Sequence, residues 1–417
     1  MKKIKFIHTA DLHLDTPFRS LSSMNKDLAE RLKDATVRSF EKIINLCISE
    51  QVDFLLVSGD IFDGEDRSLS AQLNFVKGLQ RLSGERIHTY FICGNHDPLS
   101  SWLDYLELPE NVFRFGSSKV EYVVYMKNGS PLARIYGISY RIGSENRDLA
   151  SKYKLKGRPL PFSIALLHGT VGNPGPHANY APFRIDDIAD KGFDYWALGH
   201  IHKKQIIRRA SPAVIYPGNP QGRDFGEPGQ RGCYLVEMTQ DNDPAIRFLP
   251  TQNIRFEQVT IDLTGVDKIN ALSGLIDAAT TRINDYDDST SYILKIVLKG
   301  RTPFHSILNN GGEIEALRDD FNETQLNEEH FTWIDSISVE TQPDIDINKI
   351  KKGNDFTAEV LKTIEEMNDP SKLFNEIEEE TKMPPAAKKI IAEHKTDETA
   401  IMEKVKWILL DQLVKNE

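Results

Sequence analysis

Short apolar runs rich in β-branched residues recur up to about residue 240, and they constrain the fold more than any other feature. The runs are KIKFIH, DFLLVSG, IHTYFICG, ARIYGISY, FSIALLHG, DYWALGH, AVIYPGN and GCYLVEM. Most are too continuously apolar for a strand with one solvated face, so we expect strands buried on both faces. Amphipathic helical stretches lie between the early runs, for example one with apolar side chains at Leu28, Leu32, Ala35, Val37, Phe40, Ile43, Ile44 and Cys47. The sequence therefore predicts an α/β fold.

The rest of the chain predicts two further parts. Residues 254–343 follow the order strand, helix, strand, helix, strand, which is typical of a small α+β domain. Residues 344–417 are charged and helical. Two apolar stripes in this tail are formed by Phe356, Val360, Leu361, Ile364 and Met367, and by Ile401, Val405, Ile408, Leu409 and Leu413. We therefore predict an α/β domain over 1–253, a capping domain over 254–343 and a helical tail over 344–417.

The net charge of −11 is unevenly distributed along the chain. Binding to a polyanion normally depends on clustered Lys and Arg. Residues 1–253 contain 32 Lys and Arg against 29 Asp and Glu, whereas residues 254–343 contain 7 against 16 and residues 344–417 contain 12 against 17. The first domain is therefore mildly basic, and a substrate that carries phosphate is electrostatically acceptable there.

The sequence favours a soluble, cytoplasmic protein that does not bind membranes. No uninterrupted apolar run approaches the ~18–20 residues of a membrane span, and neither end resembles a secretory or lipidation signal. The three cysteines, Cys47, Cys93 and Cys233, are isolated and form no CxxC pair. Isolated cysteines fit a reducing compartment better than a disulfide framework or a zinc ribbon.

Side chains able to bind a metal follow five of the expected strands. They are Asp11 and His13; Asp60 and Asp63; Asn95, His96 and Asp97; His168; and His200 and His202. Because functional loops collect at the carboxyl ends of strands in an α/β sheet, we expect these side chains to meet at one edge. Oxygen and imidazole donors without thiolate suit two divalent cations, with Mn²⁺ favoured and Fe²⁺ or Zn²⁺ as alternatives. Two cations need a shared carboxylate, and Asp60 is the best candidate for that bridge.

The ordered motifs DxH, GDxxD, GNHD, HG and GHxH resemble the calcineurin-like metallophosphoesterases. Within this superfamily, TADLHLD, GDIFD, FICGNHD, PGNPQGR and the acidic cap with a helical tail are similar to the DNA repair exonuclease branch. That branch includes the SbcD nuclease subunits, and the likeness is greatest to the Bacillus-type YhaO proteins. The resemblance covers most of residues 1–340, and the tail matches only in general character. It implies a β-sandwich flanked by helices, a small α+β cap domain and a C-terminal helical segment.

The resemblance also implies a ligand set. One metal would be held by Asp11, His13, Asp60 and His202, and the other by Asp60, Asn95, His168 and His200. A tight turn can aim each of the two histidines of LGHIH at a different cation. Gly199 before them leaves room for the backbone to approach the site.

His96 is expected to stabilise or protonate the departing oxygen rather than to bind a metal, and Asp97 is expected to orient and charge its imidazole. Asp63 stands where many nuclease relatives have histidine, and it is either a metal ligand or a partner of one. Three residues have open roles: His177 lies in a Gly/Pro-rich loop, and Arg223 and Arg231 either contact DNA phosphates or are ordinary solvated arginines.

The leading hypothesis is a two-metal DNA phosphodiesterase, an exonuclease or endonuclease of DNA repair or end processing. The resemblance implies a homodimer and a partner, an SbcC-like ABC ATPase of the SMC type that docks on the C-terminal helices. One alternative is a metal-dependent phosphatase or phosphodiesterase for a non-DNA substrate, because the same metal pair serves both. Protein phosphatases typically have GDxxDRG and GNHE, whereas this chain has GDIFDGE and GNHD. The other alternative is a catalytically idle adaptor for the ATPase.

Overall fold

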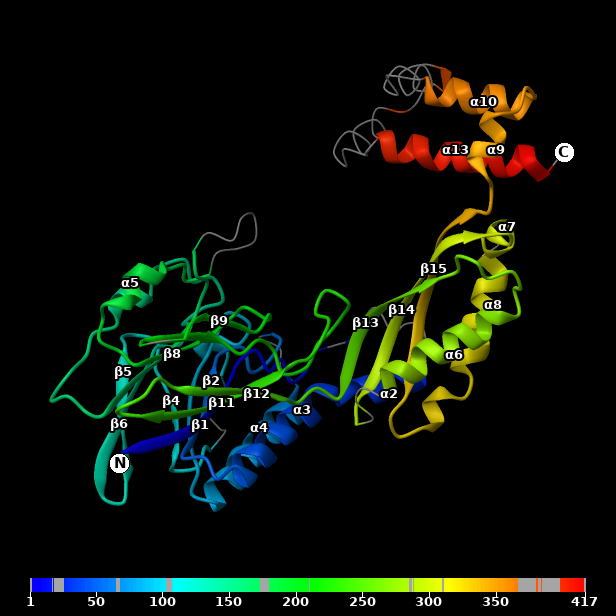
Figure 1. The fold of residues 1–417 in the computed structure, drawn as a ribbon. Coiled ribbons are helices and arrows are strands. Elements are labelled where there is room, and N and C mark those ends of the chain that lie inside the picture. Colours follow the sequence, from blue (N-terminus) through cyan, green and yellow to red (C-terminus); the bar gives the residue numbers. More distant parts are fainter. Residues whose placement is uncertain are drawn as a thin grey trace. The chain divides into compact units, whose positions relative to one another are not determined.

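The structure is a computed structural model that describes residues 2–16, 18, 26–64, 68–102, 107–172, 180–209, 211–284, 287, 289–309, 311–366, 380–381, 384 and 398–415. The chain forms two compact units (Figure 1). The first consists of Met1–Glu257 with Asp287–Ile293 and Gln325–Trp333, and the second of Gln258–Tyr286, Leu294–Thr324 and Ile334–Glu417. No helix in the described ranges is both long and apolar enough to cross a membrane.

The first unit contains two six-stranded sheets. One has the order β12 (Ala245–Pro250), β11 (Gly232–Thr239), β1 (Lys3–Thr9), β2 (Phe54–Ser58), β3 (His88–Ile92) and β4 (Val112–Arg114). Neighbouring strands from β1 to β4 are parallel, and β11 pairs antiparallel with β1 and with β12. The other sheet has the order β5 (Glu121–Lys127), β6 (Ser130–Gly137), β7 (Phe162–His168), β8 (Tyr195–Gly199), β10 (Ala213–Tyr216) and β9 (Gln205–Arg208). Its central strands β6, β7, β8 and β10 are parallel.

The two sheets pack face to face, as the alternation along each strand requires. Phe6 and Leu56 of the first sheet share one apolar core with Leu166 of the second, whereas Ile7 lies in a separate core on the opposite face. Helices α3 (Ala35–Ser49) and α4 (Leu69–Gly84) lie side by side and fill that outer core (Figure 1). Short elements complete the unit: α2 (Lys26–Lys33), α5 (Ile185–Ala189), η1 (Leu99–Ser101), η2 (Ala150–Lys152) and η3 (Gln325–Asn327). The expected β-sandwich flanked by helices is confirmed.

The order strand, helix, strand, helix, strand expected for residues 254–343 is present. It consists of β13 (Ile254–Asp262), α6 (Ala271–Asn284), β14 (Ser291–Thr302), α8 (Gly311–Asn322) and β15 (Thr332–Pro343), with one extra turn of helix, α7 (His305–Leu308). The three strands form a sheet in chain order. In the second unit, Ile276 and Leu308 share an apolar core with Ile296 and Ile334 of the sheet.

The tail forms helices α9 (Ile347–Lys351), α10 (Phe356–Glu365) and α13 (Glu398–Lys415), and α10 packs along α13 (Figure 1). Leu361, Trp407 and Leu410 form their shared core. The expected apolar stripes are partly wrong. Phe356 and Ile408 are 67% and 58% exposed, and Leu409 is also exposed, because α13 buries Trp407 and Leu410 instead. Met367 lies outside the described residues.

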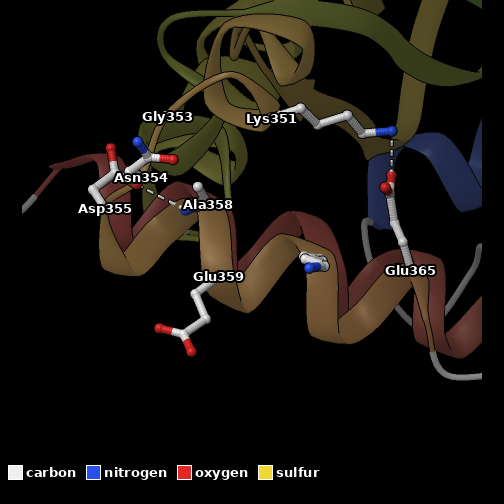
Figure 2. A pocket seen from close by; sticks show the side chains of 8 residues that line it. Lys351, Gly353, Asn354, Asp355, Ala358, Glu359 and Glu365 are labelled. Carbon is white, nitrogen blue, oxygen red and sulfur yellow. Dashed lines mark hydrogen bonds and ion pairs between the residues drawn. The ribbon is translucent and has the colours of Figure 1, made fainter.

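A cavity of about 540 Å³ lies where α9 and α10 meet (Figure 2). Its polar side chains already have structural roles. The carboxylate of Asp355 accepts a hydrogen bond of 2.8 Å from the amide of Ala358 and caps α10. Lys351 forms a 2.8 Å ion pair with Glu365. Three of the charged side chains that line this cavity therefore already stabilise the helices around it.

Candidate metal centre

All seven side chains proposed as metal ligands come together at the carboxyl ends of five strands. Strands β1, β2 and β3 of one sheet and β7 and β8 of the other end at the same edge of the sandwich. Hydrogen bonds across the sheets fix this edge, because the hydroxyl of Ser58 donates to the carbonyl of Ala197 at 2.9 Å. The carbonyl oxygen of Ser58 lies 2.9 Å from Nδ1 of His168. The sheet edge predicted from the motifs is therefore real, while each metal-binding role stays a proposal.

The backbone adopts an uncommon conformation at four of the seven positions. Asp11, His13, Asp60 and His200 have φ angles of 53°, 43°, 52° and 96°. Non-glycine residues rarely occupy this left-handed region, and such strain concentrates at functional sites, where the surrounding structure must hold it. The turns therefore serve to aim these side chains inward.

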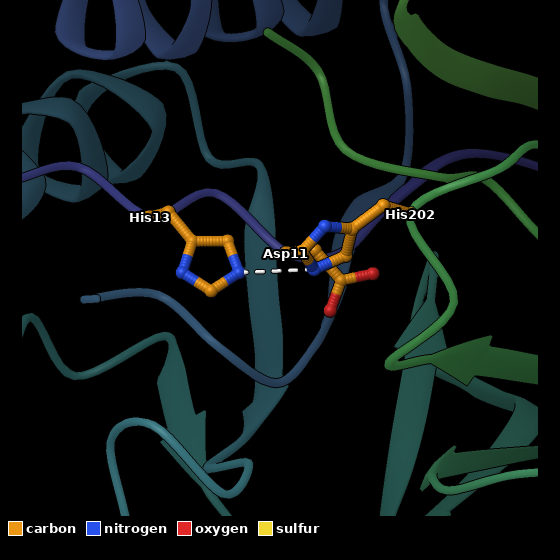
Figure 3. Close-up of side chains that lie close together, drawn as sticks. All are labelled: Asp11, His13 and His202. Atoms are coloured by element: carbon orange, nitrogen blue, oxygen red, sulfur yellow. Dashed lines mark hydrogen bonds between the residues drawn. The ribbon is translucent and has the colours of Figure 1, made fainter. Parts of the chain in front are cut away.

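The first donor group consists of Asp11, His13 and His202. The imidazoles of His13 and His202 face each other with their Nε2 atoms 3.2 Å apart, and the Asp11 carboxylate lies beside them (Figure 3). The amide of His200 donates to the carboxylate of Asp11 at 2.9 Å, which fixes its orientation.

The second donor group consists of Asp60, Asn95, His168 and His200. Oδ1 of Asn95 lies 2.9 Å from Nε2 of His168 and 3.1 Å from Nδ1 of His200. Oδ2 of Asp60 lies 3.4 Å from Nε2 of His168. The two histidines of LGHIH therefore face different groups, because the backbone turns at His200, where φ is 96°.

Asp60 lies between the two groups. Its Oδ2 atom is 3.9 Å from Nε2 of His13 in the first group and 3.4 Å from Nε2 of His168 in the second. Its Oδ1 atom accepts a 3.0 Å hydrogen bond from the amide of His96. One oxygen is thus held by the backbone, and the other faces both groups, as a bridging carboxylate must.

The lone pairs in both groups converge in a way that fits cations. Nδ1 of His168 must donate, because the Ser58 carbonyl can only accept, so Nε2 is the nitrogen that the neutral ring would offer to a cation. Nδ1 of His202 lies 2.6 Å from Glu227 and 3.0 Å from a terminal nitrogen of Arg223, and Nδ1 of His13 lies 2.8 Å from Asp63, so the two Nε2 atoms are the nitrogens that face each other inside the group. Converging oxygen and nitrogen lone pairs without thiolate are the ligands of Mn²⁺, Fe²⁺ or Zn²⁺.

Burial and neighbouring charges shift the pKa values of the donor side chains. Burial lowers the pKa of His200 to about 3 and that of His13 to about 4, so both rings are neutral and can bind a cation. Burial alone would lower the pKa of His168, but Asp60 and Asp11 outweigh it and raise the pKa to about 9. Burial would likewise raise the pKa of Asp60, but His168 and His13 hold it below its usual range. The site thus keeps its carboxylate bridge ionised and attracts positive charge.

His96 lies at the rim of the centre, where its imidazole contacts the backbone of Asp63. Nδ1 of His96 lies 2.9 Å from the carbonyl oxygen of Asp63 and therefore donates to it. The buried carboxylate of Asp97 accepts hydrogen bonds from the amides of Gly94 at 2.8 Å and Ile61 at 3.2 Å. Asp97 thus joins the loop after β3 to the loop after β2, and its contribution to catalysis stays a prediction.

The residues with open roles fall into different places. Asp63 contacts the outer nitrogen of His13, away from the converging lone pairs, which favours an orienting partner over a ligand. Arg223 pairs with Asp63 and Glu227. The buried Arg231 donates to the carbonyl of His202 and, at 2.8 Å, to Oδ1 of Asn219. These contacts place Arg231 inside the protein rather than on a surface for DNA, and His177 lies outside the described residues.

Glu227 is a site residue that the sequence does not reveal. It stands in the loop NPQGRDFGEPGQRG, far along the chain from His202, and no motif spacing connects the two. Its contact with His202 depends on how the loop between β10 and β11 folds back. The only signal for Glu227 in the sequence is that it stands in a Gly-rich loop after a strand, because such loops often carry functional residues.

We expect alanine in place of Gly199 to destabilise the first unit and weaken metal binding. A Cβ atom there would lie 1.9 Å from the carbonyl oxygen of Ser58, the same oxygen that His168 binds. Overpacking of this kind costs about 1–3 kcal/mol or more, which lowers the melting temperature by roughly 2–4 °C per kcal/mol. Calorimetry and metal analysis measure both effects. Gly84→Ala is the control, because its Cβ would meet nothing within 4 Å, and equal melting temperatures for the two variants would contradict the prediction.

Together, the sandwich and the two linked donor groups at its edge define a metal-dependent phosphoesterase. The chain belongs to the calcineurin-like metallophosphoesterase family. Residues 4–204 match the calcineurin-like phosphoesterase domain, and residues 256–342 match the middle domain of metallophosphoesterase YhaO.

The relatives agree with this assignment. The uncharacterized metallophosphoesterase YhaO of Bacillus subtilis (strain 168) is 35% identical over 347 residues, which cover 83% of this chain and 84% of the relative. The DNA double-strand break repair protein Mre11 of Sulfolobus acidocaldarius is 26% identical over 401 residues, covering 93% of this chain and 98% of the relative. That of Saccharolobus solfataricus is 26% identical over 278 residues, covering 64% and 68%.

Proposed function

We propose that this protein is a DNA phosphodiesterase that uses two divalent cations, with Mn²⁺ favoured. The observation that carries the proposal is the pair of donor groups joined by Oδ2 of Asp60. The first group would hold one cation through Asp11, His13 and His202, and the second would hold the other through Asn95, His168 and His200. When bound, the cations neutralise charge on the phosphate and lower the pKa of water so that it can attack phosphorus near neutral pH.

The chain's own residues prepare the site for this reaction. The backbone amides of His200 and His96 fix the carboxylates of Asp11 and Asp60, so little reorganisation is needed when a substrate binds. His96 is 41% exposed at the side chain, whereas the donors around it are largely buried. Its Nδ1 atom donates to the Asp63 carbonyl, so Nε2 is the nitrogen from which the imidazolium form would give a proton to the departing oxygen, leaving the neutral ring.

Two observations favour DNA as the substrate. One relative that aligns over 93% of the chain, and another that aligns over 64% of it, are named as DNA double-strand break repair proteins. The N-terminal segment that carries the site is mildly basic although its metal-binding aspartates count against it. The substrate is therefore proposed as linear or nicked DNA in repair or end processing.

Incubation of the full chain with linear, nicked and closed-circular DNA tests this proposal. We expect cleavage with Mn²⁺ and none with EDTA. Products from linear DNA alone would indicate an exonuclease, and linearised circles an endonuclease. An absence of Mn²⁺-dependent cleavage on every DNA form would contradict the proposal. Turnover of a phosphate monoester in the same preparation would instead favour the alternative, a phosphatase for a non-DNA substrate.

An SbcC-like ATPase is the proposed partner of the tail. Phe356 on α10 and Ile408, Leu409 and Val414 on α13 are apolar and exposed. Exposed apolar side chains on a helical pair offer a groove or face for a partner helix. Replacement of both Ile408 and Leu409 by Asp should abolish co-purification with the ATPase. Retained binding would contradict the proposal. A chain that binds the ATPase but shows no hydrolysis with any cation would support the idle adaptor.

Three further features belong to the proposal. The division at residues 1–253, 254–343 and 344–417 separates nuclease, cap and docking segments. A homodimer through α4 fits its exposed Leu69 and Leu73, and a sedimentation measurement that finds only the 47.3 kDa species at micromolar concentration would contradict it.

A cytoplasmic location fits three buried cysteines that form no disulfide, and recovery of the protein from an oxidising compartment would contradict it.

A further inference from the structure

The loop between β10 and β11 places the carboxylate of Glu227 against the first donor group, and both of its oxygens have hydrogen-bond partners. Oε1 of Glu227 lies 2.6 Å from Nδ1 of His202. Its Oε2 atom accepts hydrogen bonds from Nδ2 of Asn219 at 2.6 Å and from the amide of Arg223 at 2.9 Å. The side chain of Glu227 is only 12% exposed. A buried carboxylate held by this many donors is fixed in one orientation.

Arg223 joins Glu227 to a second carboxylate. One terminal nitrogen of its guanidinium lies 3.1 Å from Oδ1 of Asp63, and the other lies 3.2 Å from Oε1 of Glu227. Oδ1 of Asp63 is in turn 2.8 Å from Nδ1 of His13. Each imidazole whose Nε2 faces the other has a carboxylate at its outer nitrogen, and one arginine spans both carboxylates and also lies 3.0 Å from the outer nitrogen of His202.

The loop is also tied to the turn that carries His202. The amide of Asn219 donates to the carbonyl of His202 at 3.2 Å. Gly218 has a φ of +75°, and a Cβ there would lie 2.5 Å from that same carbonyl oxygen. The Arg223–Glu227 loop therefore approaches the metal-binding turn as closely as the backbone allows.

The chemistry of this arrangement bears on cation affinity. A carboxylate at the outer nitrogen of an imidazole fixes the tautomer, orients the ring and makes the inner nitrogen a better ligand. A planar guanidinium can hold two carboxylates at a set separation, which a lysine cannot do. The spacing between the two inner nitrogens is thus controlled from outside the ligand set.

We propose that Arg223, Glu227 and Asp63 form a positioning unit that sets the cation affinity of the first donor group, Asp11, His13 and His202. This inference rests on the proposed two-cation function. His168 in the second group is oriented by the Ser58 carbonyl instead, so the unit acts on one cation position and not on the other. The second position is therefore an internal control.

A Mn²⁺ titration of the metal-free full chain, followed by electron paramagnetic resonance and calorimetry, tests the positioning unit. We expect two sites in the natural chain. In Glu227→Ala one site should weaken by about 10–100-fold, while the other changes less than about threefold. Glu227→Gln keeps the side-chain volume and one acceptor oxygen but loses the charge. Its affinity for Mn²⁺ at this site should lie between those of the natural chain and of Glu227→Ala. Arg223→Met and Arg223→Lys should weaken the same single site, because neither side chain can span two carboxylates.

Two variants outside the centre match these changes. Glu237→Gln removes the charge of a carboxylate paired with Lys3, and Arg247→Met removes an arginine paired with Glu50. Both should leave both sites unchanged. Equal weakening of both sites in Glu227→Gln and Arg223→Lys, or no weakening, would overturn the positioning unit alone. A natural chain that binds no Mn²⁺ would overturn the proposed function, and the unit with it.

Discussion

Asparagine in place of Asp60 is expected to abolish metal-dependent phosphodiester hydrolysis, lowering the turnover of bis-p-nitrophenyl phosphate by about a thousandfold or more. The reason is the position of Oδ2, which faces His13 at 3.9 Å and His168 at 3.4 Å. An amide at this point lacks the negative charge, and its single oxygen cannot both accept from the amide of His96 and face the two groups. Mn²⁺ content, measured by mass spectrometry after gel filtration, should fall at both positions together.

The matched control for this change is Asp186→Asn. Asp186 is an exposed carboxylate of α5 that pairs only at the surface with Arg184, so its loss should leave both turnover and metal content as they are. Turnover of Asp60→Asn within tenfold of the natural chain would contradict the bridging role. Loss of only one cation would also contradict it, since it would place Asp60 in one group alone.

Glutamine in place of His96 is expected to lower kcat for DNA by about 10²–10⁴-fold while leaving the metal content unchanged. Nε2 of His96 is the free atom of a ring held by the Asp63 carbonyl, and this ring lies 5.0 Å, centre to centre, from that of His13. A DNA alkoxide needs a proton to leave, whereas p-nitrophenolate does not. We therefore expect less than about a tenfold loss with bis-p-nitrophenyl phosphate.

The comparison between the two substrates separates an acid from a ligand. An equal loss on both substrates, accompanied by a lower metal content, would make His96 a metal ligand and overturn the assignment. His88→Gln is the control, because His88 stands at the opposite end of the same strand, β3. It should change neither kcat nor the metal content.

The sequence predicts the interior of the fold better than its borders, for a physical reason. All eight apolar runs become strands, and all eight lie inside the two sheets. The four unpredicted strands, β4, β5, β9 and β12, are the four sheet edges. Edge strands such as β9, with no fully buried residue, have one unpaired side and less apolar surface to cover. Their sequences therefore lack the continuous apolar run that marks an interior strand.

The donor residues could be predicted because each follows an interior strand within a few positions. Their partners could not. Glu227 and Arg223 reach the centre from a loop whose folding depends on contacts between distant parts of the chain. The same holds for Asp97, whose carboxylate accepts hydrogen bonds from two loop amides. In the tail, helical spacing alone could not tell that α13 buries Trp407 and Leu410 rather than Ile408.

Each donor group takes its members from both sheets: Asp11 and His13 follow β1 of one layer, and His202 follows β8 of the other. A cation seated in either group would therefore act as a cross-link between the layers. Cation binding and the free energy of unfolding are then linked, since a ligand present at a hundred times its Kd stabilises the folded state by about 2.7 kcal/mol. A low concentration of the free cation would thus lower the stability of the sandwich as well as the catalytic activity.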